Sequence, residues 1–230
     1  MGVIVNPVFV VLSSKTWHDK LFEDLRDNVE ATWIRLKEFN KFNLENLDQW
    51  KPDMIFIPHW SYIIPEEIFL KYDCIVFHMT DLPYGRGGSP LQNLITRGHN
   101  KTKISALKVV KELDAGPVYL KRELSLDGNA TEIFQRASSI IQSMIREIID
   151  QDIKPIGQDG VPVLFKRRTP SESNLADVKS KEEAYDYIRM LDAEGYPHAF
   201  LETENLRFEF TEAIISENGQ LKANVRIFKK

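Results

Sequence analysis

Apolar and polar positions alternate in blocks along the first half of the chain. Four short runs are rich in β-branched and aromatic residues, which is typical of buried strands. They cover residues 8–14 (VFVVLSS), 31–39 (ATWIRLKEF), 53–59 (DMIFIPH) and 74–78 (CIVFH). Residues 15–28 instead repeat apolar side chains at helical spacing. Strands that alternate with helical segments predict a parallel, doubly wound α/β sheet, in which ligands bind at the carboxyl ends of the strands.

The second half of the chain predicts further helices and strands. Ser89 and Pro90 stand where an N-cap and a first helical residue are favoured, so a helix is expected over 89–98. The other expected elements are a strand-like stretch from 103 with a turn at 114–116, a strand over 117–126, a long helix over 129–150, a helix over 180–193, and strands over 206–215 and 221–228. Residues 157–169 look loop-rich, so we expect a domain over 1–165 and a small C-terminal α+β unit over 166–230.

Composition places the chain among ordinary globular proteins. Of its 230 residues, 43% are hydrophobic and 28% are charged, and the formal net charge is −4. This balance disfavours partners held mainly through a broadly basic surface, such as nucleic acid. The single cysteine, Cys74, lies in an apolar run, and the five histidines show no metal-ligand spacing, so neither a disulfide nor a metal site is expected. The apolar start lacks the flanks of a signal peptide, and no run reaches about 18 apolar residues, so we expect a cytoplasmic protein.

A chemistry-bearing pattern begins at His78, at the end of the fourth apolar run. It reads H-x-x-D-L-P-x-x-R-G-G-S-P, and L-D-A-G follows at residues 113–116. The sequence lacks a G-x-G-x-x-G loop, a Walker loop, a G-x-S-x-G elbow and an H-E-x-x-H helix. In order and spacing, the pattern resembles the signature of the 10-formyltetrahydrofolate-dependent formyltransferases. The matching residues are His78, Pro83, Arg86, Gly87, Leu113, Asp114, Ala115 and Gly116.

The resemblance implies a Rossmann-like domain that moves a formyl group from 10-formyltetrahydrofolate to an amine. In the family, the positions that match His78 and Asp114 are catalytic. A histidine can stabilise the negative charge that develops on the formyl oxygen, and a nearby carboxylate can take the proton of the attacking amine. The chain departs from the family at Val76, where an Asn usually stands. Positions 76 and 78 share one face of a strand, so an apolar side chain replaces the usual amide beside His78.

The resemblance also implies binding residues. The stretch 56–65 (FIPHWSYIIP) corresponds to the family segment that lines the folate pocket. The expected folate-binding residues are Trp60, Ser61, Tyr62, Ile63, Arg86 and Gly87. Two segments of the tail, FKRRTPSES and YIRMLDAEGYPHAF, resemble those of nucleotide-sugar N-formyltransferases and, in part, of tRNA formyltransferases. The expected acceptor-binding residues are Thr80, Gly88, Arg168, Arg189 and Tyr196, and the two arginines suit the phosphate oxygens of a diphosphate.

The sequence therefore predicts an enzyme that formylates the amino group of a nucleotide-linked amino-deoxysugar, as used for bacterial surface glycans such as lipopolysaccharide O-antigen. Its partners are expected to be the sugar nucleotide and, as a candidate assembly, a second copy of the chain, without nucleic acid, membrane or metal. Three alternatives stay open. They are a methionyl-tRNA formyltransferase-like enzyme, an enzyme with another acyl donor, and a folate- or nucleotide-sugar-binding module whose catalysis is lost, as Val76 suggests.

Overall fold

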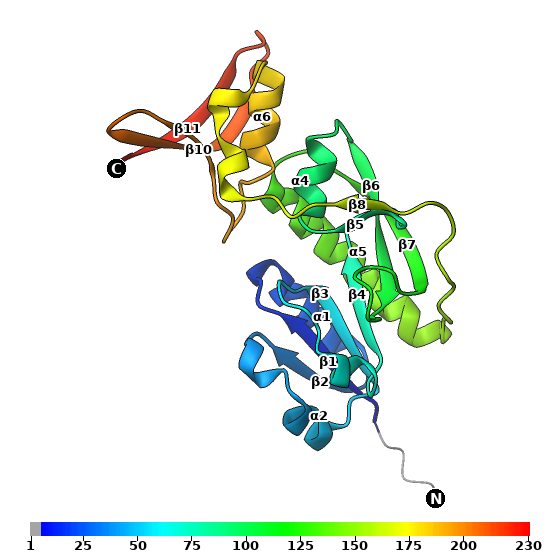
Figure 1. Cartoon of the computed structure of the whole chain (residues 1–230). Helices are drawn as coiled ribbons and strands as arrows, with labels where there is room; N and C mark the ends of the chain where they lie inside the picture. The colour runs from blue at the N-terminus through cyan, green and yellow to red at the C-terminus, as the bar shows by residue number, and fades with distance from the viewer. Residues whose placement is uncertain (1–5) are drawn as a thin grey trace, which may run out of the picture. The chain divides into compact units, whose positions relative to one another are not determined.

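The protein is described by a computed structural model that covers residues 6–230. Contacts divide the chain into two compact units (Figure 1). The first unit contains the chain up to Arg86 with residues 103–124 and 135–164, and the second contains residues 87–102, 125–134 and 165–230. The last change of unit, near residue 165, falls where the sequence suggests a domain boundary, although two earlier segments also belong to the second unit.

A six-stranded sheet in the order β2-β1-β3-β4-β6-β7 forms the centre of the fold. The strands are β1 (Val8–Ser13), β2 (Thr32–Leu36), β3 (Met54–His59), β4 (Cys74–His78), β6 (Lys101–Lys108) and β7 (Val118–Ser125). The first four strands are parallel, and β6 runs antiparallel to β4. This arrangement confirms the predicted α/β fold with a mostly parallel sheet.

The apolar runs are buried because the sheet is covered on both faces. Val10, Leu12, Ile55 and Ile57 are fully inaccessible to solvent and belong to one hydrophobic cluster with Cys74. Burial of a side chain of this size stabilises the fold by about 1.5–3 kcal/mol relative to exposure. The continuous apolar character of these strands is what a parallel sheet requires.

The helices connect and cover the strands, and several are shorter than expected. They are α1 (Asp19–Asn28), α2 (Leu44–Trp50), α3 (Glu66–Phe69), α4 (Pro90–Ile95), α5 (Ala130–Gln151) and α6 (Lys181–Arg189), with 3-10 turns η1 (Thr16–His18), η2 (Phe39–Lys41), η3 (Pro170–Ser173) and η4 (Leu175–Asp177). Helices α2 and α3 were missed at the sequence level because each has at most two turns. Within residues 6–230, no helix has the length and apolar character needed to cross a membrane.

The glycine-rich segment contains a strand that the sequence did not predict. Strand β5 (Tyr84–Gly87) pairs with β8 (Val163–Phe165), so two segments expected as loops form a two-stranded sheet. A Cβ on Gly87, which has φ of +113°, would overlap the carbonyl oxygen of Phe165. The sequence signal was read as a loop because this pairing depends on a partner far along the chain.

Ser89 precedes helix α4 as expected but does not cap it. Its backbone is left-handed, with φ of +51°, and its side chain makes no capping hydrogen bond to the helix. The hydroxyl instead accepts a hydrogen bond of 3.1 Å from the backbone N–H of Arg168. The expected N-cap is therefore a tie to the later segment of the second unit.

The C-terminal part of the second unit is the small α+β appendage that the sequence predicts. Strands β9 (Ala199–Glu202), β10 (Leu206–Ile215) and β11 (Leu221–Lys229) form an antiparallel sheet in the order β11-β10-β9. Ser180 precedes helix α6 and caps it, because its side chain accepts a hydrogen bond from the backbone N–H of Glu183.

A buried histidine links the start of α1 to α5 within the first unit. His18 is 2% exposed, and its Nδ1 lies 2.8 Å from the hydroxyl oxygen of Ser138. Burial lowers the pKa of His18 to about 3, and the positive charges of His59 and Arg35 act in the same direction. The ring is therefore neutral in the folded protein at ordinary pH.

This histidine predicts a loss of stability in acid. In the unfolded chain His18 binds a proton below about pH 6.5, whereas the folded ring does so only near pH 3. The unfolded state binds more protons between about pH 6.5 and 3. The free energy of unfolding should therefore decrease as the pH is lowered through this window, by up to about 1.4 kcal/mol per pH unit. We expect His18→Gln to remove this part of the slope in denaturant titrations between pH 4.5 and 8. Ser138→Ala keeps the imidazole of His18 and should retain this slope. If the free energy of unfolding of wild type and of His18→Gln changes with pH in the same way, the assignment to His18 is wrong.

Candidate active site

His78 ends strand β4 and is held by a backbone carbonyl. The side chain is buried, and its Nε2 lies 2.7 Å from the carbonyl oxygen of Gly85. A carbonyl oxygen can only accept, so Nε2 carries the hydrogen in this contact. The other ring nitrogen, Nδ1, is then the position at which a proton can be gained or lost.

Asp114 faces that second nitrogen. Its Oδ2 lies 3.6 Å from Nδ1 of His78, and the two side chains are 9% and 8% exposed, so the pair is shielded from water. The distance exceeds that of a direct hydrogen bond but keeps the carboxylate within reach of the ring. The structure thus brings together the two residues that the family resemblance marks as catalytic.

The backbone of the L-D-A-G turn explains its sequence. Asp114 has φ of +52°, in the left-handed region that few residues other than glycine adopt. A Cβ on Gly116 would overlap the carbonyl oxygen of Lys108 on β6. The glycine therefore permits the close approach that places the turn against the sheet.

The segment after His78 is tied down by polar contacts from β6 and β7. Ser105, which pairs in register with His78, donates a hydrogen bond of 2.7 Å to the carbonyl oxygen of Thr80. The Thr80 hydroxyl, expected to bind the acceptor, is fully buried and donates to the Gly85 carbonyl at 3.4 Å. Lys121 on β7 forms a 2.6 Å ion pair with Asp81. These contacts fix the carbonyl that orients His78.

Gln158 was missed at the sequence level, yet it contacts two predicted site residues. Its Oε1 accepts from Nε and Nη2 of Arg86 at 3.1 and 2.7 Å. Its Nε2 donates to the carbonyl oxygens of Asp114 and Gly116, each at 2.8 Å. A lone glutamine in a loop carries no sequence signal of its own, and only the fold brings it to the turn.

The predicted folate stretch is a loop after β3 with aromatic side chains. Trp60 and Tyr62 contact each other at 5.4 Å between ring centroids, and Phe39 packs against both. Tyr62 and Ile63 are 57% and 75% exposed. Among residues 6–230, the indole Nε1 of Trp60 is a buried donor without a hydrogen-bond partner. Aromatic surface and an unsatisfied donor are what a flat polar heterocycle would use.

Val76 occupies the apolar environment that its side chain suits. It lies two residues before His78 on β4, is half-buried, and packs against the hydrophobic cluster that contains Cys74. An Asn at this position would place its amide partly against apolar side chains. The departure from the family pattern is thus matched by the packing around it.

Four of the expected acceptor-binding residues belong to the second unit. Gly88 lies so close to Arg167 that a Cβ would be 2.6 Å from the Arg167 Cβ. Tyr196 stacks on Phe134 with centroids 5.4 Å apart, and burial raises the pKa of its hydroxyl. Arg168 lies over the ring of Tyr187 at 5.2 Å and donates to the carbonyl oxygen of Glu172. Among residues 6–230, Nε of Arg168 is nevertheless a buried donor without a hydrogen-bond partner.

Arg189 is engaged inside the second unit rather than displayed to a ligand. The residue is 9% exposed. Its Nη1 donates to the carbonyl oxygens of Leu126 and Gly128 at 2.6 and 2.8 Å, and its Nε pairs with Asp186 at 2.7 Å. This arginine therefore joins α6 to the segment before α5, and these contacts disfavour the expected diphosphate contact.

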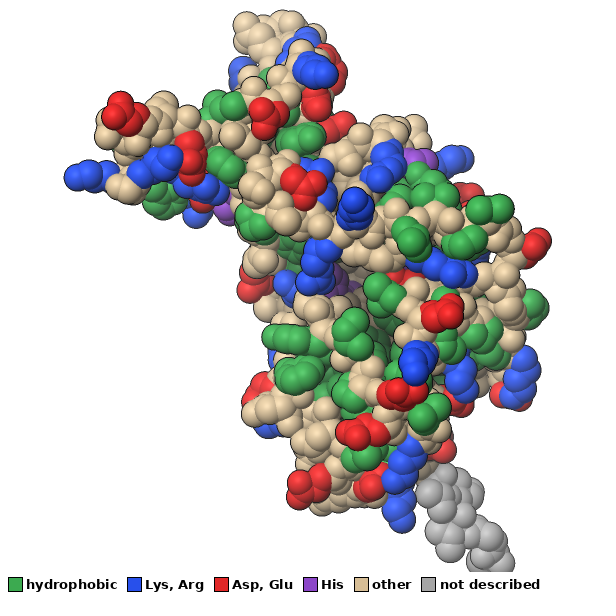
Figure 2. Space-filling model, in the orientation of Figure 1, with side chains coloured by type: hydrophobic (Ala, Val, Ile, Leu, Met, Phe, Trp, Pro, Cys, Tyr) green, Lys and Arg blue, Asp and Glu red, His purple; other side chains and the backbone are tan. Residues whose placement is uncertain are grey.

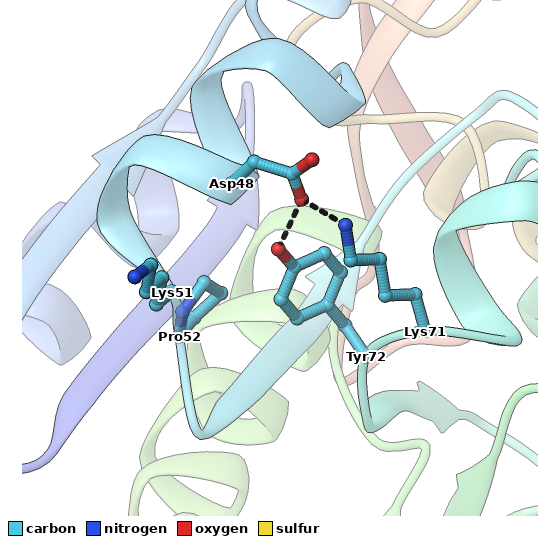
Figure 3. Close-up of a pocket in the computed structure, with 5 residues that line it drawn as sticks. All are labelled: Asp48, Lys51, Pro52, Lys71 and Tyr72. Atoms are coloured by element: carbon cyan, nitrogen blue, oxygen red, sulfur yellow. Dashed lines mark hydrogen bonds and ion pairs between the residues drawn. The ribbon is translucent and has the colours of Figure 1, made fainter.

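A separate shallow pocket of about 460 Å³ is lined by Asp48, Lys51, Pro52, Lys71 and Tyr72 (Figure 3). Asp48 accepts hydrogen bonds there from Lys71 and from the hydroxyl of Tyr72, at 2.6 and 2.5 Å. Burial, and then the contact with Asp48, raises the pKa of Tyr72 to about 12. The pocket residues precede β3 and β4, at the opposite strand ends from His78. In the described part of the chain, no three His, Cys, Asp or Glu side chains gather as a metal ion requires.

Comparison with known families gives the assignment. A model described as "Formyl transferase" matches residues 5–139, which is more than half of the chain. The chain belongs to the formyl transferase family. A second model, described as "Methionyl-tRNA formyltransferase, C-terminal domain", matches residues 170–228. The predicted family is therefore confirmed, while its sugar-nucleotide branch is not.

Individual relatives point in the same direction. A solved structure described as methionyl-tRNA formyltransferase from Clostridium thermocellum is 43% identical, covers 97% of this chain and all of that chain, and has a TM-score of 0.94. The methionyl-tRNA formyltransferase of Bacillus velezensis is 28% identical over 80% of this chain, which spans only 60% of that protein. A 4-N formyltransferase from Francisella tularensis, at 14% identity, 95% and 96% coverage and a TM-score of 0.65, shares the fold alone.

The catalytic pair yields a direct test. We expect His78→Asn and Asp114→Asn each to lower kcat for formyl transfer by at least about 100-fold, the scale of general acid–base and charge-stabilising groups. Asp114→Asn is nearly isosteric, and His78→Asn replaces the ring by a smaller polar side chain, so circular dichroism and the Tm are measured to show that the fold is intact. A variant that retains more than about a third of wild-type kcat would exclude the role given to that residue.

The apolar neighbour of His78 yields a second test. We expect Val76→Asn to lower the free energy of unfolding by about 1–3 kcal/mol, because an amide enters a partly apolar site. Formyl transfer should persist, since valine and asparagine have similar volumes and the amide adds a donor beside His78. Val76→Ala controls for lost packing. A folded Val76→Asn protein without activity would show that this pocket requires an apolar side chain.

Proposed function

We propose that the protein transfers a formyl group from 10-formyltetrahydrofolate to a primary amine. The observation that carries this proposal is the shielded pair of His78 and Asp114, with one ring nitrogen fixed on a carbonyl and the other 3.6 Å from the carboxylate. Membership of the formyl transferase family supports the same chemistry.

The residues after β3 fit the formyl donor. The exposed ring of Tyr62 and the unsatisfied Nε1 of Trp60 would hold its flat ring system, and Arg86 lies in the adjoining glycine-rich segment. When bound, the folate supplies the formyl group as an activated acyl donor. The contribution of the chain is to hold this donor and to manage the proton of the attacking amine.

The geometry of His78 and Asp114 indicates how the pair accepts a proton and stabilises charge. Nδ1 of His78 and the carboxylate of Asp114 can accept one proton from the attacking amine between them, because Nε2 is committed to the Gly85 carbonyl. The same proton would pass to the folate nitrogen as its bond to the formyl carbon breaks. The protonated ring carries a positive charge, which favours the negative charge that develops on the formyl oxygen. Shielding from water strengthens this interaction.

As acceptor we propose the α-amino group of methionyl-tRNA. The support is the 43% identity to the Clostridium thermocellum protein over nearly the whole chain, and the C-terminal family model over residues 170–228. This acceptor replaces the sugar nucleotide as our first candidate. The match to the Bacillus velezensis protein, of which this chain spans 60%, agrees with this acceptor.

A nucleotide-linked amino sugar is the second candidate, and charge is the observation that favours it. Residues 166–230 contain 12 Asp and Glu against 11 Lys and Arg, so this unit has no excess of positive charge. On the face drawn in Figure 2, blue and red side chains are interspersed rather than gathered by sign. Phosphate contacts by Lys and Arg supply much of the affinity for nucleic acid, so a unit without an excess of positive charge favours a small acceptor.

One competition experiment separates the candidates. Purified protein is incubated with 10-formyltetrahydrofolate and one acceptor at a time. The acceptors are methionyl-tRNA, a panel of 3-amino and 4-amino deoxysugar nucleotides, and the free amino sugars. We expect saturable formylation of methionyl-tRNA, detected by mass spectrometry after hydrolysis, with rates that fall as salt rises. Formylation of a sugar nucleotide, inhibited by free nucleoside diphosphate, would establish the second candidate instead.

Controls distinguish loss of catalysis from a wrong acceptor. Asp114→Asn should bind 10-formyltetrahydrofolate in calorimetry without turning it over. If wild type binds the folate but formylates none of the acceptors, the binding-module alternative is favoured. If it does not bind the folate, the formyl donor itself is wrong.

A further inference from the structure

The side chain of Gln158 is a fully satisfied bridge between two parts of the candidate site. A carboxamide has two N–H donors and two acceptor positions, and here all four are used. Two N–H groups of Arg86 donate to Oε1, and Nε2 donates to the carbonyl oxygens of Asp114 and Gly116. The four distances lie between 2.7 and 3.1 Å.

The loop that carries Gln158 is itself anchored within the first unit. On one side, the backbone of Ile156 exchanges two hydrogen bonds with Val118 on β7, at 2.8 and 2.9 Å. On the other side, the backbone N–H of Val163 donates to the carbonyl oxygen of Pro83 at 3.1 Å. The glutamine is therefore presented from a fixed segment, so its contacts do not depend on ordering a free loop.

The turn that Gln158 holds is closed by a backbone hydrogen bond of 3.3 Å from Ala115 to Glu112, and its tip is exposed. Leu113 is 59% exposed, and Lys111 and Glu112 are also exposed. Asp114 nevertheless adopts a left-handed backbone conformation, which surrounding contacts must maintain. The two carbonyls that Gln158 binds flank the Ala115 residue next to Asp114, so they fix the peptide planes that aim the carboxylate at His78.

We propose that Gln158 is a positioning residue that aligns the carboxylate of Asp114 with His78 and, through the same amide, holds the guanidinium of Arg86. This inference rests on the proposed formyl transfer, in which His78 and Asp114 manage the proton. Gln158 acts through Asp114 and has no assigned contact with the reacting atoms. Misplacing a catalytic group by about 1 Å can cost about 100-fold in rate, so loss of this bridge should be felt mainly in kcat.

The chemistry of the site makes glutamine hard to replace. Glutamate could accept from Arg86, but its second oxygen would face two carbonyl oxygens and could donate to neither. Leucine or methionine would retain much of the volume but would leave the carbonyls and the guanidinium without these partners. Asparagine is shorter by one methylene and cannot span the same distances.

A kinetic comparison on the full chain tests the proposal. We expect Gln158→Leu and Gln158→Glu to lower kcat by about 10- to 100-fold, a larger effect than the rise in KM for the folate that follows from the lost contact to Arg86. Gln92→Leu is the matched control, because the Gln92 amide is buried and donates to the Met190 carbonyl at 2.9 Å in the second unit. It should lower the Tm without changing kcat or the pH–rate profile, whereas Gln158→Leu should shift the pH–rate profile.

A double-mutant cycle separates positioning from general stabilisation. In the Asp114→Asn background, Gln158→Leu should cost less than about threefold, because a residue that acts through Asp114 has nothing left to align. An equal loss in both backgrounds, or retention of more than half of wild-type kcat by Gln158→Leu, would overturn the proposal. Gln158→Met replaces Gln158→Leu in the cycle if the latter does not fold.

A measurement without substrate keeps this inference distinct from the proposed function. The ¹⁵N chemical shifts of the His78 ring, followed by NMR in the free protein, should change in Gln158→Leu and stay unchanged in Gln92→Leu. If wild type formylates no acceptor but the His78 signals respond, the proposed function fails and the positioning role stands. Unchanged His78 signals in Gln158→Leu would reject the positioning role whatever the activity.

Discussion

The hydrogen bond between Nε2 of His78 and the carbonyl oxygen of Gly85 is the contact on which the candidate chemistry depends. It fixes which ring nitrogen holds its hydrogen, and so which one faces Asp114. The contact exists only because the chain reverses within seven residues of the strand end. The glycines, the prolines and the buried Thr80 and Ser105 contacts are the means of holding that reversal in place.

Polar side chains carry much of this support, and each is satisfied by a partner within the first unit. Ser105 binds the Thr80 carbonyl, Lys121 pairs with Asp81, and Gln158 binds the turn of Asp114. Buried polar groups that lack partners cost about 1–3 kcal/mol each, so a network of this kind specifies one arrangement strongly when it is complete. The nearby Trp60 indole is the contrasting case, a buried donor whose partner a ligand could supply.

In the second unit, a match to the family does not identify the residues that contact a ligand. Its sheet and α6 match the family in sequence, yet Arg189, which the motif suggested for phosphate, is used to bind backbone carbonyls. A buried guanidinium with several acceptors is a stable structural solution, because all its donors would otherwise lose hydration. A motif match in this region is therefore informative about family membership and much less so about ligand contacts.

The sequence by itself determined the α/β class, the parallel strands, and the identity of His78 and Asp114 as a pair. Continuous apolar runs fix strands through burial, and the family pattern carries the two residues in order. The tertiary structure alone decided the β5–β8 pairing, the tie between Ser89 and Arg168, and the bridge made by Gln158. Each of these joins segments more than 40 residues apart by hydrogen bonds between common polar groups. Local propensity and periodicity depend on residues that are neighbours in the chain. They therefore cannot predict contacts that depend on the packing of distant segments.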